Sequence, residues 1–306
     1  MSKRNWALVA ATLVSVIYGI TFTVAKDVMP RYVAPFGFIA MRVGGSMLLF
    51  WLVAFLAPTR AIANWRSKEK IALNDFPRII AAALFGVAIN MLTFFKGLSY
   101  TSPIMAAVLM VTTPIIVLVL SAIIMKERMK KRKIFGIVLG LAGTVTLILY
   151  GKSVINAPNA SLGNLLVFIN AVSYGLYLIL VKKLMDKYNA FTFVKWIYTF
   201  GFLMVLPFGW SEFQAINWNS IPTPIAWEIG FVILFSTFLT YLLNLLSMRE
   251  LKPTTIAVFI YLQPLFATII AISLGKDDLS WVKLLSAALV FAGVYLVTMK
   301  KSSQSQ

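Results

Sequence analysis

The feature that most constrains this chain is a series of long apolar runs separated only by short polar segments. An α-helix of about 18 to 20 residues crosses the ~30 Å hydrocarbon core of a bilayer. Runs of that length fill most of the sequence. They lie at 6–25, 34–57, 78–97, 103–125, 134–151, 163–181, 191–210, 226–247, 253–275 and 282–299. The sequence therefore predicts an all-α polytopic membrane protein with ten transmembrane helices.

The composition agrees with a membrane bundle and excludes several kinds of chemistry. Hydrophobic residues make up 60% of the chain and charged residues only 12%, about half the charged share of a soluble domain. The chain has no cysteine and no histidine, so disulfides, thiol nucleophiles, imidazole bases and soft-metal sites are excluded. An intramembrane enzyme would need such a catalytic set. We therefore expect no enzyme activity, no metal and no cofactor.

The placement of the basic residues explains the net charge of +18. Lys and Arg gather in short segments between the apolar runs, as topology signals do, so we expect the lipid bilayer and not nucleic acid as the partner. If the N-terminus is cytoplasmic, 21 of the 28 basic residues face the cytoplasm and 6 face outward, while Arg42 lies within a run. This bias predicts that both termini are cytoplasmic in a bacterial inner membrane, and that the run after Lys3 and Arg4 is an uncleaved first helix.

The two halves of the chain resemble each other. A shift of 156 residues pairs eight positions in order, Val16, Tyr18, Gly19, Lys26, Met29, Tyr32, Ala34 and Gly45 with Val172, Tyr174, Gly175, Lys182, Met185, Tyr188, Ala190 and Gly201. A shift of 150 pairs later positions, including Pro103, Pro114, Lys126, Lys133 and Gly143 with Pro253, Pro264, Lys276, Lys283 and Gly293. We expect residues 1–152 and 153–306 to form two five-helix repeats. Because five is odd, the second would be inverted, with a substrate site near the midplane.

Several motifs resemble one known family. The first half carries Phe95–Ser102, Pro114 and Lys126–Arg128, and the second carries Tyr261–Pro264 and Gly275–Asp277. Tyr18 with Gly19, and Arg42, occupy places where that family often has an aromatic-glycine pair and an arginine. Along the whole chain the sequence resembles the EamA family of the drug/metabolite transporter (DMT) superfamily. The resemblance implies transport of amino acids, drugs or other metabolites, and it does not specify the substrate.

Arg42 is the most suggestive single charge. It lies about eight residues, or roughly 12 Å, inside the second apolar run. A charge at that depth costs several kcal/mol unless it is paired or hydrated. One interpretation is a guanidinium that faces an anionic group of the substrate. The other is a structural arginine whose side chain extends to the outer interface.

Other polar and aromatic residues near the span centres complete the predicted site. A polar group there should face the interior, a neighbouring helix or water, although some of these groups will simply tie helices together and some aromatic rings will simply pack. The predicted substrate-binding residues are Tyr18, Arg42, Asn90, Phe94, Thr113, Tyr174, Tyr177, Tyr241, Asn244, Tyr261 and Gln263. Pro114 and Pro264 are predicted to kink their helices, either as gating hinges or as static bends.

The acidic residues all fall at or near the ends of the predicted spans. A buried proton relay normally needs an intramembrane carboxylate or histidine, so we predict a facilitated carrier or exchanger without one. The predicted function is alternating-access transport of small organic metabolites, as an amino-acid or metabolite exporter or exchanger. The alternatives are an importer or exchanger of a nucleotide-derived or other anionic metabolite, and a membrane scaffold without a conduit.

A glycine face bears on the oligomeric state. Gly136 and Gly140 form a Gly-x-x-x-Gly face, which permits close approach of two helices. That face could mark a dimer interface, but we expect it to serve packing within the repeat. We expect a monomer or a weak homodimer.

Overall fold

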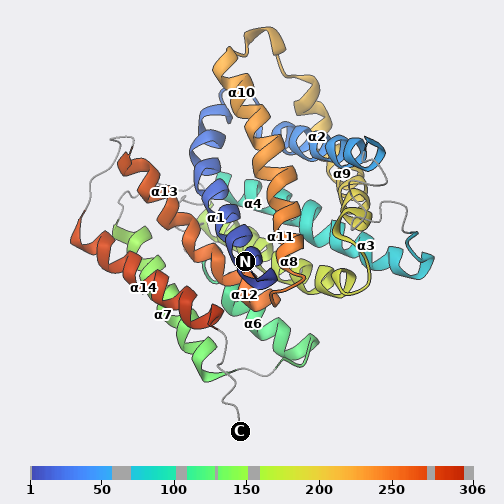
Figure 1. The fold of residues 1–306 in the computed structure, drawn as a ribbon. Coiled ribbons are helices and arrows are strands. Elements are labelled where there is room, and N and C mark those ends of the chain that lie inside the picture. The colour runs from blue at the N-terminus through green and yellow to red at the C-terminus, as the bar shows by residue number, and fades with distance from the viewer. Residues whose placement is uncertain are drawn as a thin grey trace.

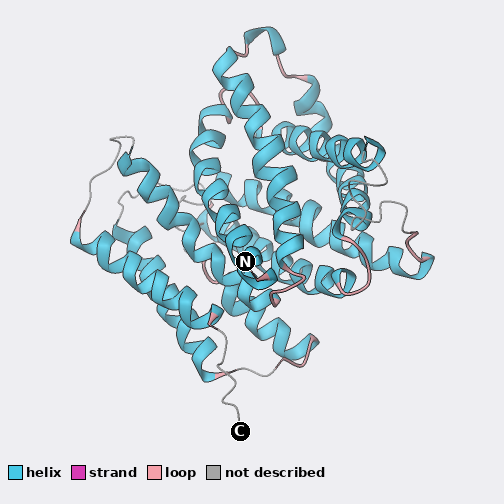
Figure 2. Ribbon diagram, viewed as in Figure 1, coloured by secondary structure: helices cyan, strands magenta, loops and turns pink. Residues whose placement is uncertain are grey.

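A computed structural model of the protein describes residues 2–56, 70–100, 109–127, 130–150, 159–273 and 280–299. Within these ranges the regular structure is helical and no strand occurs (Figures 1 and 2). Eight helices are long and apolar enough to cross a membrane: Lys3–Thr21, Pro35–Leu56, Leu73–Gly97, Ser161–Met185, Ala190–Gln214, Thr223–Ser247, Pro253–Ile270 and Trp281–Thr298. Thr113–Ile124 is a shorter apolar helix. The predicted all-helical membrane protein is confirmed.

The elements follow the predicted runs closely. The first half contains α1 (Lys3–Val28), α2 (Pro35–Leu56), α3 (Phe76–Ala83), α4 (Ile89–Tyr100), α6 (Thr113–Ile124) and α7 (Lys131–Tyr150). The second half contains α8 (Ala160–Met185), α9 (Ala190–Gln214), α10 (Thr223–Phe231), α11 (Thr240–Ser247), α12 (Pro253–Val258), α13 (Leu262–Ser273) and α14 (Trp281–Thr298). Two short 3₁₀ turns, η1 (Leu73–Asp75) and η3 (Trp218–Ser220), precede α3 and α10. The first part of the predicted span 103–125, up to residue 108, lies outside the described residues.

Several helices are interrupted within their spans. A π-helix, η2 (Leu84–Ala88), joins α3 to α4, and a second, η4 (Val232–Leu239), joins α10 to α11. A 3₁₀ turn, η5 (Phe259–Tyr261), separates α12 from α13. Such interruptions shift the backbone hydrogen bonds and often mark functional sites. The sequence patterns did not predict the two π-helices.

The two prolines predicted as hinges both follow an interruption. Pro114 lies in the first turn of α6, directly after a turn at residues 111–112. Pro264 lies in the first turn of α13, directly after η5. Because proline lacks an amide hydrogen, it fits the start of a helical segment better than the interior. The expected discontinuities are therefore present, while movement about them stays a prediction.

The helices pack in a pattern that brings the halves together. Helix α2 lies along α9, and α7 lies along α14 (Figure 1). Helix α1 packs against α11 and α13, and α8 packs against α4 and α6. The interior of the bundle is thus formed by helices from both halves.

The glycine face on α7 is used within the chain. A Cβ atom at Gly136 would lie 2.8 Å from the backbone oxygen of Gly293, and one at Gly293 would lie 2.6 Å from the backbone nitrogen of Gly140. Helices α7 and α14 therefore touch through their backbones, which only glycine permits at these positions. This contact joins the two halves, so the expected packing within one repeat is wrong and packing within the chain is correct.

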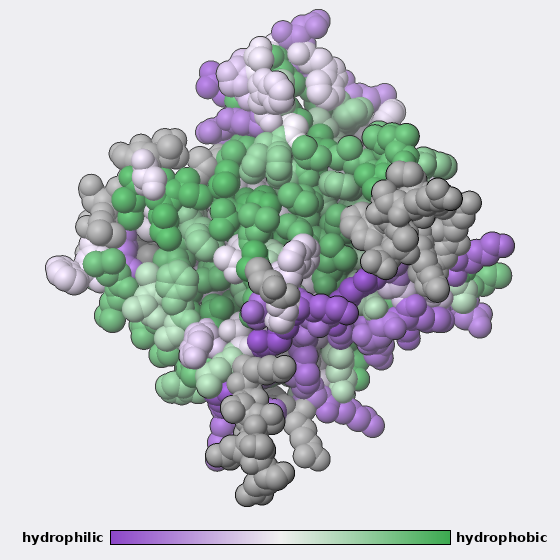
Figure 3. All heavy atoms as spheres, viewed as in Figure 1, coloured by the Kyte–Doolittle hydropathy of each residue, from purple (hydrophilic) through white to green (hydrophobic). Residues whose placement is uncertain are grey.

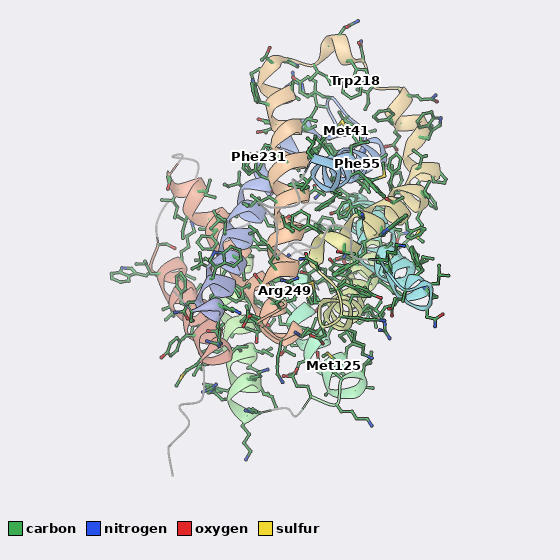
Figure 4. The ribbon with its side chains drawn as sticks, turned by 45° about the vertical axis from the view of Figure 1, so that its right-hand side comes forward. Met41, Phe55, Met125, Trp218, Phe231 and Arg249 are labelled. Carbon is green, nitrogen blue, oxygen red and sulfur yellow. The ribbon has the colours of Figure 1, made fainter. Side chains whose placement is uncertain are left out.

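The polar residues gather at the ends of the bundle. Figure 3 shows an apolar surface across the middle of the visible face and hydrophilic residues toward its ends. In Figure 4, Trp218 lies at one end, whereas Met125 and Arg249 lie toward the other. At this second end the guanidinium of Arg4 donates to the backbone carbonyl of Thr298. The beginning of α1 and the end of α14 are therefore on the same side.

Candidate substrate-binding site

A cluster of tyrosine side chains occupies the interior where the two halves meet. The ring centroids of Tyr174 and Tyr177, on α8, are 6.0 Å apart. The Tyr177 centroid lies 6.1 Å from that of Tyr241 on α11, which in turn lies 5.1 Å from that of Tyr198 on α9. Tyr18, on α1, joins the cluster through its hydroxyl, which lies 3.3 Å from the hydroxyl of Thr240. Four of the predicted site residues therefore converge here.

Arg42 points into this cluster from α2. Only 8% of its surface is exposed, so the side chain is buried, and both the substrate-facing and the structural interpretation stay predictions. Its Nε atom donates a 3.1 Å hydrogen bond to the hydroxyl of Thr237. Thr237 lies in η4, four residues before Tyr241 of α11, so this bond holds the guanidinium near the cluster.

The guanidinium of Arg42 has no carboxylate partner in the described part of the chain. The ion pairs found there all involve other residues, and Thr237 is the one hydrogen-bond partner of Arg42 within those ranges. A guanidinium carries five N–H donors in a fixed planar arrangement. The two terminal nitrogen atoms of Arg42 are therefore available to an anionic group that enters the cluster.

Backbone carbonyls in the two π-helices accept hydrogen bonds from side-chain hydroxyl groups at the site. These bonds fix the positions of the side chains that donate them. The Tyr241 hydroxyl donates to the carbonyl of Gly86 in η2 at 2.9 Å, and the Ser173 hydroxyl donates to that of Phe85 at 2.6 Å. In η4 the Thr237 hydroxyl donates to the carbonyl of Val232, five residues earlier, at 2.9 Å. Thr237 thus bridges the π-helix and Arg42, which fixes the position of the guanidinium.

Glycine is required where the first π-helix approaches the cluster. A Cβ atom at Gly86 would lie 2.1 Å from Cδ2 and 2.6 Å from Cε2 of the Tyr177 ring. Tyr177 can therefore lie flat against the η2 backbone only because residue 86 has no side chain.

Three predicted site residues serve other contacts. Asn90 and Asn170 exchange amide-to-carbonyl hydrogen bonds of 3.5 and 2.7 Å, which tie α4 to α8. The hydroxyl of Thr113, fully buried, donates to the carbonyl of Met110. Tyr261 is also fully buried, but its ring lies against Gly140 of α7, where a Cβ atom would meet Cδ2 at 2.5 Å. None of the three joins the tyrosine cluster.

The remaining predicted residues lie at the margin of the cluster or apart from it. Asn244 lies on α11, three residues after Tyr241, and is 8% exposed. Phe94, on α4, packs with its ring 5.3 Å from that of Phe95. Gln263 is half-buried on α13, and its backbone oxygen would lie 3.2 Å from a Cβ atom at Gly19.

Tyr198 and Thr237 belong to the site and were missing from the sequence prediction. A signal for Tyr198 was present, because the shift of 156 residues that pairs Tyr18 with Tyr174 also pairs Arg42 with Tyr198. Tyr198 lies near the middle of the predicted span 191–210 and was not singled out there. No pattern distinguished Thr237 from other mid-span threonines.

One carboxylate lies deeper than the sequence suggested. Glu228 is on α10, within the span Thr223–Ser247, and its Oε2 atom is buried without a hydrogen-bond partner in the described structure. Asp27, near the end of α1, is close enough to act on it electrostatically. Glu228 lies nine residues before Thr237, the hydrogen-bond partner of Arg42, so the two residues are about 13 Å apart along the helix axis. In the described ranges no group of three or more potential metal ligands occurs.

An ionic cluster ties the two halves together at the end that carries the termini. Glu127, after α6, accepts from Lys133 at 2.7 Å and pairs with Lys252, before α12, at 3.2 Å. Lys133 also donates to the hydroxyl of Thr254 at 3.0 Å. Burial alone would raise the pKa of Glu127, but its hydrogen bonds with Lys133 and Lys252, and their charges, hold that pKa below its ordinary value.

Comparisons with known proteins agree with this architecture. The model of the EamA-like transporter family matches residues 5–149 and 161–299. An uncharacterized transporter of Archaeoglobus fulgidus is 25% identical over 300 residues, which cover 97% of this chain and 100% of that protein. The uncharacterized transporter YyaM of Bacillus subtilis is 25% identical, covering 92% and 89% of the two chains. A solved crystal structure, 16% identical, shares the fold with a TM-score of 0.76 over 96% of this chain and 97% of the other.

Proposed function

The chain belongs to the EamA-like transporter family, and from this premise we propose that it carries small organic metabolites across the bacterial inner membrane by alternating access. Membrane transport itself follows from the family and from relatives that are named as transporters. The proposed substrates are amino acids or related metabolites, moved by export or exchange.

The observation that carries this proposal is the buried guanidinium of Arg42. A buried charge without a partner is costly, so the site favours a substrate whose carboxylate completes the pair. Bidentate binding of a carboxylate matches the geometry of a guanidinium. The ring of Tyr174, which is only half-buried, offers favourable contacts for an ammonium group or an apolar side chain. An amino acid carries all three features.

We further propose that the two halves, 1–152 and 153–306, are inverted repeats that rock about this site. The family model matches each half separately. The packing supports this proposal, because interchanging the two halves gives equivalent contacts. Helix α2 of the first half packs on η4 of the second, and α9 of the second half packs on η2 of the first. The π-helix Leu84–Ala88, shifted by 150 residues, falls within the π-helix Val232–Leu239. The basic end that carries both termini would then be cytoplasmic.

Transport is proposed to follow the substrate gradient without a proton relay at the site. The polar groups near Arg42 are tyrosine and threonine hydroxyls, and Glu228 lies about 13 Å from Thr237 along its helix. If Glu228 carried a coupled proton, an imposed pH gradient would drive uptake and Glu228→Gln would abolish that effect. We expect neither result.

The proposal is tested by counterflow in proteoliposomes with labelled amino acids, nucleosides and organic ions. We expect counterflow of an amino acid, with Arg42→Gln lowering the rate at least tenfold. Arg31→Gln, which removes an arginine outside the cluster, is the matched control and should leave the rate unchanged. Counterflow of a nucleotide-derived anion alone would replace the amino-acid assignment, and equal rates for wild type and Arg42→Gln would contradict the site.

A further inference from the structure

The hydroxyl of Tyr198 is the polar group that the structure leaves unexplained in the centre of the bundle. Tyr198 is fully buried, yet its hydroxyl oxygen makes no hydrogen bond of good geometry within the described residues. The hydroxyl of Tyr241 is near, but it already donates to the carbonyl of Gly86 at 2.9 Å. A buried phenol normally finds a partner. Among the described residues, the oxygen of the Tyr241 hydroxyl is the one neighbour that could accept the hydrogen of Tyr198, and no hydrogen bond of good geometry forms, so a ligand oxygen in the cluster would compete with Tyr241 for that hydrogen.

Position connects this hydroxyl to Arg42. Helix α2 lies along α9, so Arg42 and Tyr198 come from adjacent helices of different halves. Arg42 bonds to Thr237, four residues before Tyr241, and the Tyr241 ring centroid lies 5.1 Å from that of Tyr198. The shift of 156 residues relates the two positions to each other. Arg42 and Tyr198 thus occupy corresponding positions in the two halves. The first half has a cation at this position, and the second half has a neutral hydrogen-bond donor.

We propose that Tyr198 is a specificity-determining residue which, together with Arg42, binds one carboxylate group across the interface between the halves. This inference rests on the proposed function and narrows its substrate class to monocarboxylates. The terminal nitrogens of Arg42 bind the carboxylate, because its Nε atom is already bonded to Thr237. The Tyr198 hydroxyl donates to the same group from the other half.

The charge balance favours a carboxylate over a phosphate. Arg42 is the one buried lysine or arginine among the residues that the structure describes. A phosphate monoester carries about −1.5 to −2 charges at neutral pH. A single guanidinium and a neutral phenol balance one negative charge, as a carboxylate has. Because the two donors come from different halves, movement of the halves also breaks this contact and releases the substrate.

The test compares Tyr198→Phe with Tyr261→Phe in proteoliposomes. Both substitutions remove one hydroxyl that is buried without a hydrogen-bond partner, but Tyr261 lies against Gly140 outside the cluster. The probes are labelled L-leucine and L-phenylalanine, with their carboxamides as competitors that keep the shape and lack the negative charge. Hydrogen bonds to charged groups are worth enough to change affinity by about tenfold or more.

We expect Tyr198→Phe to raise the half-saturation concentration for the amino acid about tenfold, and Tyr261→Phe to leave it unchanged. The carboxamides should compete poorly in wild type, and this discrimination should weaken in Tyr198→Phe. Equal behaviour of the two phenylalanine variants would overturn the inference. If Arg42→Gln still lost transport, the proposed function would stand.

Folding is checked by the melting temperature of each variant in detergent. Because the removed hydroxyl has no partner, Tyr198→Phe should melt no lower than wild type. A variant that fails to fold would show that the hydroxyl is a structural contact, which also overturns the inference.

Discussion

Gly86→Ala is the substitution for which the structure gives the clearest magnitude. The new Cβ atom would lie 2.1 Å from Cδ2 of Tyr177, whereas ordinary contacts begin at 3.4 Å, so the ring must move by about 1.3 Å. Backbone of η2 is on one side, and the fully buried Tyr198 and the nearly buried Tyr241 limit movement on the other. Overpacking of this kind typically costs about 1–3 kcal/mol.

Gly230→Ala is the matched control, since it also adds one methyl group to a helical glycine. A Cβ atom at Gly230 meets nothing within 4 Å. Alanine is favoured over glycine within a helix by about 0.8–1 kcal/mol, so this variant should melt at or slightly above the wild-type temperature. Because the helix preference of alanine applies to both variants and cancels, the difference between them is expected to be about 1–3 kcal/mol, the overpacking cost.

The assay is thermal unfolding in detergent followed by tryptophan fluorescence, together with amino-acid counterflow. Gly86→Ala should melt several degrees below Gly230→Ala and should transport more slowly, because a displaced Tyr177 disturbs the site. A double-mutant cycle with Tyr177→Ala isolates the clash, since without the ring the cost of the Gly86 methyl group should disappear. Equal melting and transport of Gly86→Ala and Gly230→Ala would refute the placement of the ring.

Three other predictions follow from contacts outside the cluster. The pKa of Glu127 is held below its ordinary value, against the effect of burial, by Lys133 above all. The contribution of Glu127 to the folding free energy is therefore present above the unfolded-state pKa and is lost as the pH falls through the lower folded-state pKa. The melting temperature should fall over that pH range in wild type and fall less in Glu127→Gln. Glu212 accepts two backbone hydrogen bonds, of 2.6 and 2.9 Å, at the start of α2, so Glu212→Ala should lose about 1 kcal/mol of stability, whereas Glu250→Ala, at an exposed site, should melt as wild type does. Glu228→Gln should leave counterflow unchanged between pH 6 and 8 in a liposome assay, and a loss of flux would reveal a coupled proton.

The spans could be predicted from the sequence because hydrophobic length alone determines them. No comparable signal distinguishes one face of a uniformly apolar helix from another. A charge within a span is expected to face the interior, and the structure buries Arg42 there, while its role in substrate binding stays a prediction. Tyr18 and Tyr174 were placed by the shift that relates the two halves. The fold therefore followed from length and repetition, and the site followed where a residue was costly in lipid or repeated.

Tyr261, a predicted site residue outside the tyrosine cluster, lies in a helix interruption. A π-helix holds more residues per turn than an α-helix, and each residue added to a helix rotates those after it by about 100°. Tyr261 lies in the 3₁₀ turn η5, and there the spacing that predicts a shared face no longer applies. Its ring accordingly lies against Gly140 on α7 and not in the tyrosine cluster. Interruptions of this kind have no signal in hydropathy, because both conformations bury the same apolar residues.

The proposed pairing of Arg42 with Tyr198 would explain how a fold of two inverted repeats could bind an asymmetric molecule. If both halves carried arginine at this position, two guanidinium groups would lie together in the interior, and their repulsion and desolvation would destabilise the site. If both carried tyrosine, no charge would balance a carboxylate. One cation and one neutral donor give a single orientation, with the carboxylate toward α2 and α9 and the rest of the substrate toward the rings of Tyr174 and Tyr177 on α8. On this proposal, the difference between the halves at this one position is what allows the site to select its substrate.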